Sequence, residues 1–66
     1  MIAVLKLGTT EKQIESLRQW IESQGLKVHL SKGEFQTIIG LVGDTSKIDE
    51  ELLGSLDIVE SVKRIS

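Results

Sequence analysis

The sequence predicts a single α+β domain with the element order β-α-β-β-α-β. Three observations support this prediction. Residues 10–25 have the cap, the apolar stripe and the glycine stop of a helix. Residues 2–7, 26–31 and 35–42 have the apolar or alternating patterns of strands. The chain has 66 residues, which is enough for one domain spanning residues 1–66 and no more.

The first strand is predicted over residues 2–7, which are apolar at every position except Lys6. Apolar residues on both alternating faces are typical of a central strand covered on both sides, rather than of an edge strand. Gly8 and Thr9 end this strand.

The first helix has the clearest signals in the chain. Thr10 and Gln13 have the spacing of a capping box, in which the side chain of each residue accepts a hydrogen bond from the backbone N–H of the other. An apolar arc of about 120° follows at 3.6 residues per turn. Its members are Ile14, Leu17, Trp20 and Ile21. Gly25 supplies the stop expected just past the end of a helix.

The next two elements read as a hairpin. Leu26, Val28 and Leu30 alternate with Lys27, His29 and Ser31, which predicts a half-buried strand with one polar face. A tight turn is predicted at residues 32–33, and residues 35–42 form its β-rich partner.

A short helix and a last strand complete the order. Residues 43–46 read as a turn and a helix cap, and the helix that follows is predicted to end at Gly54. The last strand is predicted over residues 59–65. Its apolar positions Val59, Val62 and Ile65 do not share one parity, so we expect a bulge or an offset start.

This order and these lengths predict a ferredoxin-like fold. Right-handed crossovers would place both helices on one face of a four-stranded antiparallel sheet. The other face is then bare, and a bare face or a sheet edge is where such a domain meets a ligand, a partner or its own copy. A small domain without cysteine also favours association with another surface.

Composition argues against several functions known for this architecture. An RNA-recognition domain places two or three aromatic residues on its open sheet face, but of the two aromatic residues in this chain, Phe35 and Trp20, the second lies on a predicted helix. It has no cysteine and one histidine, so we expect no metal and no cofactor. It has no asparagine, which an acyl-phosphate hydrolase of this shape would use. The net charge is −2 without a basic cluster, so neither nucleic acid nor membrane is expected as a partner. The apolar start is too short for a signal peptide, which favours the cytoplasm.

The candidate binding residues are His29 and Ser31, on the polar face of the second predicted strand. Together they can donate and accept hydrogen bonds to a carboxylate, an amine or a phenol. The alternative is that they form only the solvated face of an amphipathic strand, which is an ordinary arrangement. We predict no catalytic residues, because a single histidine without an obvious supporting group is weak evidence for an active site.

Four stretches together resemble a known family. They are residues 2–11, the H-x-S-K-G run at 29–33, the I-G-x-x-G-D run at 39–44, and the S-L-D-x-V-E-S-V run at 55–62. They resemble the ferredoxin-like (ACT-like) N-terminal regulatory domain of microbial 3-deoxy-D-arabino-heptulosonate-7-phosphate (DAHP) synthases. The resemblance covers essentially the whole chain and is fairly specific in combination.

The resemblance implies a regulatory role. In that family a TIM-barrel transferase condenses phosphoenolpyruvate with erythrose 4-phosphate, at the entry to the shikimate pathway. The appended domain is not catalytic. It binds tyrosine or phenylalanine between domains of different subunits and mediates feedback inhibition. Carried onto this chain, the effector contacts would be His29 and Ser31. The implied partners are the aromatic amino acid, a second copy through the sheet face or edge, and the catalytic barrel.

Two alternatives remain at the level of sequence. The chain can be an effector-sensing domain, or a dimerisation module of the same fold that responds to no effector. An enzymatic role is the least favoured, because these 66 residues contain no barrel.

Overall fold

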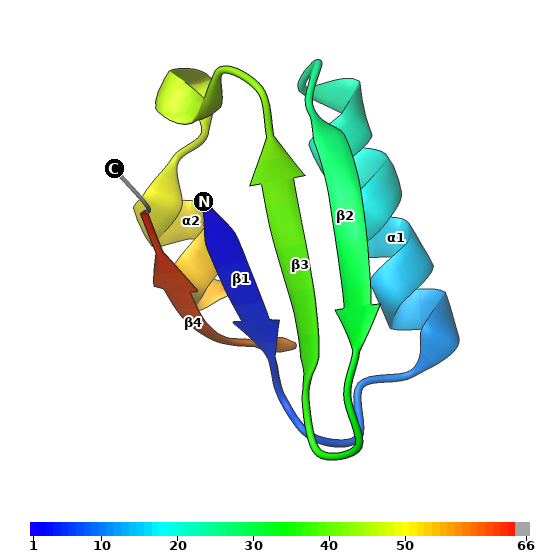
Figure 1. The fold of residues 1–66 in the computed structure, drawn as a ribbon. Helices are drawn as coiled ribbons and strands as arrows, with labels where there is room; N and C mark the ends of the chain where they lie inside the picture. The colour runs from blue at the N-terminus through cyan, green and yellow to red at the C-terminus, as the bar shows by residue number, and fades with distance from the viewer. Residues whose placement is uncertain (65–66) are drawn as a thin grey trace.

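The computed structural model describes residues 1–64 and confirms the βαββαβ order of a ferredoxin-like fold (Figure 1). The elements are β1 (Ile2–Leu5), α1 (Glu11–Ser23), β2 (Lys27–Lys32), β3 (Thr37–Val42), a 3₁₀ turn (Thr45–Lys47), α2 (Glu50–Ser55) and β4 (Val59–Lys63).

The four strands form one antiparallel sheet in the order β2-β3-β1-β4. Both helices lie behind this sheet in the view of Figure 1, which leaves the front face uncovered. The prediction that the first strand is central is therefore confirmed. The expectation that it is covered on both sides is not met within residues 1–64, because only the face toward the helices is covered.

The core lies between the sheet and the helices. Ala3, Leu5 and Ile39 are fully buried on the sheet side, where Ala3 pairs with Ile39. From the helices, Ile21 and Leu53 are fully buried against them. The other core residues are Ile14, Leu17, Leu26, Leu41, Ile48 and Val59. The apolar arc predicted for the first helix is thus the face that covers the sheet, with Trp20 partly buried at its edge.

Both ends of α1 follow the sequence signals. The Thr10 hydroxyl oxygen accepts a hydrogen bond from the Gln13 N–H (3.2 Å), and the Gln13 side-chain oxygen accepts one from the Thr10 N–H (2.9 Å). Gly25 follows the helix with a φ of +85°, in the left-handed region that favours glycine. The capping box therefore holds the chain where it leaves the β1–α1 loop.

Replacing Thr10 with alanine is expected to lower the free energy of unfolding by about 1 kcal/mol, because the Gln13 N–H at the helix start loses the hydroxyl oxygen that accepts its hydrogen bond. Urea denaturation followed by circular dichroism measures the change. Thr10→Ser keeps the hydroxyl and is the matched control, which should stay within about 0.5 kcal/mol of the wild type. Equal losses in both variants would show that the methyl group, and not the cap, matters.

The hairpin and the second helix differ from prediction in detail. The turn spans residues 33–36 instead of 32–33. The Gly33 N–H donates a hydrogen bond to the Gln36 carbonyl (2.7 Å), which closes the turn and leaves Phe35 at its tip. Gly54 does not end α2, which continues to Ser55. It lies within the last turn, where there is room for a Cβ 3.8 Å from Val62.

The first strand ends at Leu5 and not at residue 7. The side chain of Leu7 is 81% exposed. The predicted irregularity in the last strand is confirmed as a bulge: Val4 pairs with Ser61 and Leu5 with Val59, so Glu60 has no partner on β1. Ile65, predicted as the end of that strand, lies outside the described residues.

Candidate functional site

His29 and Ser31 lie next to each other on the uncovered face of the sheet, as the alternation of β2 predicts. Val28 and Leu30, which alternate with them, pack against the core on the opposite side. Both His29 and Ser31 are exposed. Successive side chains of a strand point to opposite faces, so residues two apart share one face.

The strand register places a glycine beside His29 and an apolar residue beside Ser31. His29 pairs with Gly40 of β3, which pairs in turn with Ile2 of β1. Ser31 pairs with Ile38, which pairs with Val4. Ile2, Val4 and Ile38 are half-buried although no helix covers them. The uncovered face therefore has an apolar centre beside a polar edge.

Gly40 leaves a gap in this face. A Cβ built there would lie 3.6 Å from the His29 Cβ and 3.5 Å from its carbonyl oxygen, which is ordinary contact. The fold thus has room for a Cβ at this position. The glycine exposes the backbone between His29 and Ile2, where a planar ligand group can approach closely.

A hollow of about 710 Å³ opens beside Ser31, toward the β2–β3 hairpin. Within the part of the chain that the structure describes, this hollow, hereafter the hairpin hollow, takes residues from three strands and two loops. They are Lys6, Leu7, Ser31, Gly33, Phe35, Gln36, Ile38 and Glu60. The sequence identified only Ser31 among them as a binding residue. Its volume is within the range of small-molecule sites, roughly 300–1,000 Å³.

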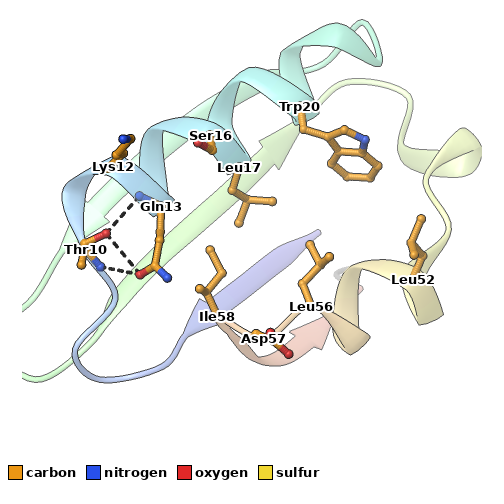
Figure 2. Close-up of a pocket in the computed structure, with 10 residues that line it drawn as sticks. All are labelled: Thr10, Lys12, Gln13, Ser16, Leu17, Trp20, Leu52, Leu56, Asp57 and Ile58. Atoms are coloured by element: carbon orange, nitrogen blue, oxygen red, sulfur yellow. Dashed lines mark hydrogen bonds between the residues drawn. The ribbon is translucent and has the colours of Figure 1, made fainter.

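A second hollow, of about 640 Å³, lies between α1 and α2 on the other side of the sheet (Figure 2). Leu17, Trp20, Leu52, Leu56 and Ile58 form its apolar part. Two of its polar residues, Thr10 and Gln13, bond to each other in the capping box (Figure 2). Trp20, a member of the apolar arc predicted for the first helix, is partly buried and lines this space.

Two charged groups whose pKa is perturbed lie on α1 and at the N-cap of the 3₁₀ turn. A hydrogen bond from Arg18 lowers the pKa of Glu15. Hydrogen bonds from the Ser46 hydroxyl and N–H lower the pKa of Asp44. Both shifts arise from local pairs, so they do not mark the uncovered sheet face as a site of proton transfer.

Residues 1–64 contain no group of three histidine, cysteine or acidic residues placed to bind a metal ion. Among the same residues, no helix has the length and apolarity needed to cross a membrane. What the described residues do provide is a sheet face with hydrogen-bonding groups at its edge and apolar groups at its centre. By fold and surface, the chain is a ferredoxin-like domain.

The chain belongs to the family described as DAHP synthase ferredoxin-like domain, which matches residues 1–66. A phospho-2-dehydro-3-deoxyheptonate aldolase from Thermotoga maritima is 46% identical to it over 65 residues. The crystal structure of a phospho-2-dehydro-3-deoxyheptonate aldolase (DAHP synthase) from Thermotoga maritima superimposes with a TM-score of 0.90 at 45% identity. The two Thermotoga matches each cover 98% of this chain but 19% of the relative, so the chain spans about a fifth of the length of these proteins.

Proposed function

We propose that this chain is the regulatory domain of a DAHP synthase and that it binds an aromatic amino acid, tyrosine or phenylalanine, at His29 and Ser31. The observation that carries the proposal is their position side by side on an uncovered sheet face, with Ile38 and Gly40 as their direct neighbours. A phenol or an α-amino acid group can hydrogen-bond to the two side chains. The aromatic ring can then cover the apolar centre of the face.

Pairing with a second copy would complete the site. A ligand that lies on an open sheet face stays exposed to water on one side. When a second surface covers the ligand, more of its apolar area is buried and its affinity increases. Burial of apolar surface contributes roughly 25 cal/mol per Å². Ile2, Val4 and Ile38 are already half-buried within one copy, and a bound ring together with a second sheet face would cover them further.

The regulated activity would belong to a catalytic barrel joined to this domain. The relatives are about five times longer than the region they share with this chain, and their name describes an aldolase of the DAHP synthase type. We propose that effector-bound domains pair and obstruct the entrance of the barrel, which gives feedback inhibition of the shikimate pathway. The effector shifts this equilibrium only if it binds the paired state more tightly than the open state.

A second function is favoured by one observation, the apolar centre of the uncovered face. Two copies can bury Ile2, Val4 and Ile38 against each other without any ligand. The domain would then serve assembly alone. Sedimentation of the chain with and without amino acids separates the two functions, because only the effector-binding domain associates more strongly when tyrosine or phenylalanine is added.

The variants His29→Ala and Ser31→Ala are each expected to weaken binding of the effector about ten- to a hundredfold. Each removes a hydrogen bond to a ligand group that is buried on binding, and such a bond accounts for roughly 1–3 kcal/mol. Isothermal titration calorimetry with tyrosine and with phenylalanine measures the affinity.

Ser16→Ala is the matched control, because Ser16 is an exposed serine on α1, across the sheet from the site. It should leave the affinity unchanged, and circular dichroism should show that all three variants are folded. Wild-type affinity in both site variants would remove His29 and Ser31 from the site. Absence of binding by the wild type to either amino acid would refute the proposed function.

A further inference from the structure

The hollow between α1 and α2, hereafter the helix groove, lies on the opposite side of the sheet from the hairpin hollow and from His29 and Ser31. The proposed function does not use it. Its walls leave large apolar side chains in contact with water: Leu52 is 49% exposed, and Trp20 and Leu56 are half-buried. An open apolar surface of this kind is typical of a face that another molecule covers.

Figure 2 shows how the two walls of the helix groove are arranged. One wall is α1, with Lys12 toward one end and Trp20 toward the other. The opposite wall is α2 and the segment that leads to β4, with Leu52 at the Trp20 end and Asp57 farther toward the Lys12 end. The groove therefore has an apolar residue on each wall at one end, and a cation and an anion on opposite walls farther along.

Both charges are placed against the dipole of their own helix. Lys12 is the second residue of α1, where the dipole favours an anion. Asp57 follows the C-cap of α2, where the dipole favours a cation. Neither side chain takes part in an ion pair with another residue in the range 1–64. Each charge would therefore be stabilised by an opposite charge on a second surface.

We propose that the helix groove is a self-complementary interface through which two copies of this chain pair by their helices. A two-fold axis along the groove sets each wall of one copy against the opposite wall of the other. Leu52 of each copy then covers Trp20 of the other, and Lys12 of each copy faces Asp57 of the other. The same rotation brings Asp57 toward the N-terminus of α1 in the second copy, which the helix dipole favours.

The size of this face limits the strength of the pairing. An interface of ordinary size buries about 800 Å² on each partner. The chain measures 29 × 21 × 19 Å along its principal axes and has an accessible surface of 4549 Å². One of its faces can supply an interface near the ordinary size, but not the larger ones of obligate dimers. We therefore expect a reversible dimer of micromolar or weaker affinity.

Sedimentation equilibrium without any amino acid, over a concentration series that reaches the millimolar range, measures this dimerisation. Trp20, the only tryptophan of the chain, reports on the groove, because an indole that becomes covered emits at shorter wavelength. In the wild type, dimers and this emission shift are expected to appear together. Leu52→Gln should dimerise at least about tenfold more weakly, since both halves of the interface lose an apolar contact. Ile38→Thr, on the uncovered sheet face, is the matched control and should dimerise as the wild type does.

Charge reversal tests the arrangement of the two copies. Lys12→Glu and Asp57→Lys each set like charges opposite one another twice in the dimer, so each should weaken dimerisation about five- to tenfold. The combined variant again has opposite charges face to face, and its dissociation constant should return to within about twofold of the wild-type value. Both substitutions give a helix end the sign that its dipole favours, so a weakened fold would not account for weaker pairing.

Four outcomes would overturn the inference. One is a wild type that stays monomeric throughout the series. A second is dimerisation that Ile38→Thr weakens and Leu52→Gln does not, because the sheet faces then form the dimer. A third is a combined charge variant that pairs as weakly as the single ones, which excludes the two-fold arrangement. The fourth is an emission shift of Trp20 that appears only when a separate DAHP synthase barrel is added, because the barrel then occupies the groove.

The inference does not depend on the proposed function, because the helix groove and the uncovered sheet face are on opposite sides of the sheet. Calorimetry with tyrosine on Leu52→Gln and on the charge variants should give the wild-type affinity. Loss of pairing with unchanged tyrosine affinity supports a separate interface at the groove. Loss of tyrosine binding in Leu52→Gln would place the ligand in the groove and would overturn the inference.

Discussion

Replacing Ile39 with alanine is expected to leave a large fraction of the protein unfolded at 25 °C. Ile39 is fully buried at the middle of the sheet, paired with Ala3 on one side and Leu30 on the other. Truncating such a side chain costs about 2–5 kcal/mol. A core of this size rarely supplies more than about 3–5 kcal/mol of net stability. The loss therefore approaches the whole free energy of unfolding.

Val42→Ala is the control on the same strand, where the side chain is 54% exposed. It removes a β-branched residue but little buried surface, so its effect should stay below about 1 kcal/mol. Urea denaturation followed by circular dichroism compares both variants with the wild type. An Ile39→Ala protein that unfolds at the wild-type urea concentration would mean that the sheet and helices can close around the missing atoms, contrary to the cavity that a close-packed core is expected to keep.

The features that the sequence could predict depend on local patterns. Thr10 and Gln13 are three residues apart, and their mutual hydrogen bonds need no distant partner. The same holds for Gly25, whose positive φ is required at the helix end. The alternation in β2 assigns His29 to one face and Leu30 to the other wherever the strand is placed in the sheet. One short stretch of sequence is therefore enough to predict that His29 and Ser31 share a polar face.

The surroundings of those residues could not be predicted, because they depend on register. Nothing local to β1 shows that Ile2 lies across from Gly40, or Val4 across from Ile38. The apolar pattern of β1 therefore predicts a strand covered on both sides, whereas in residues 1–64 its outer face forms the centre of the open surface. The uneven alternation of β4 predicted a bulge, but only the pairing with β1 identifies Glu60 as the extra residue.

Phe35 illustrates a different limit. The sequence predicts it at the start of the strand over residues 35–42, because aromatic residues favour strands. The structure places it at the tip of the hairpin, where pairing between Gly33 and Gln36 leaves residues 34 and 35 as the turn. A signal for this was present in the sequence: Gly33 and the polar residues Glu34 and Gln36 around Phe35 are more typical of a turn than of a strand interior.

The largest effect on activity is expected when this domain is fused ahead of a DAHP synthase barrel that lacks regulation. Saturating tyrosine or phenylalanine should lower the synthase rate of the fusion at least about tenfold. A tenfold change requires a differential affinity of about 1.4 kcal/mol between the paired and open states. The free domain should pair only weakly, because tethering raises the effective concentration of a partner, often to the millimolar range.

The matched controls are the bare barrel and a fusion that carries both His29→Ala and Ser31→Ala. Neither should respond to amino acids, and both should therefore run at the uninhibited rate whether or not effector is present. Sedimentation establishes that the fusion assembles as the bare barrel does, and calorimetry establishes that it binds effector. A fusion that assembles, binds tyrosine and still runs at full rate would separate sensing from gating. In that case binding at His29 and Ser31 would not block the barrel, and the inhibition mechanism proposed for this domain would be wrong.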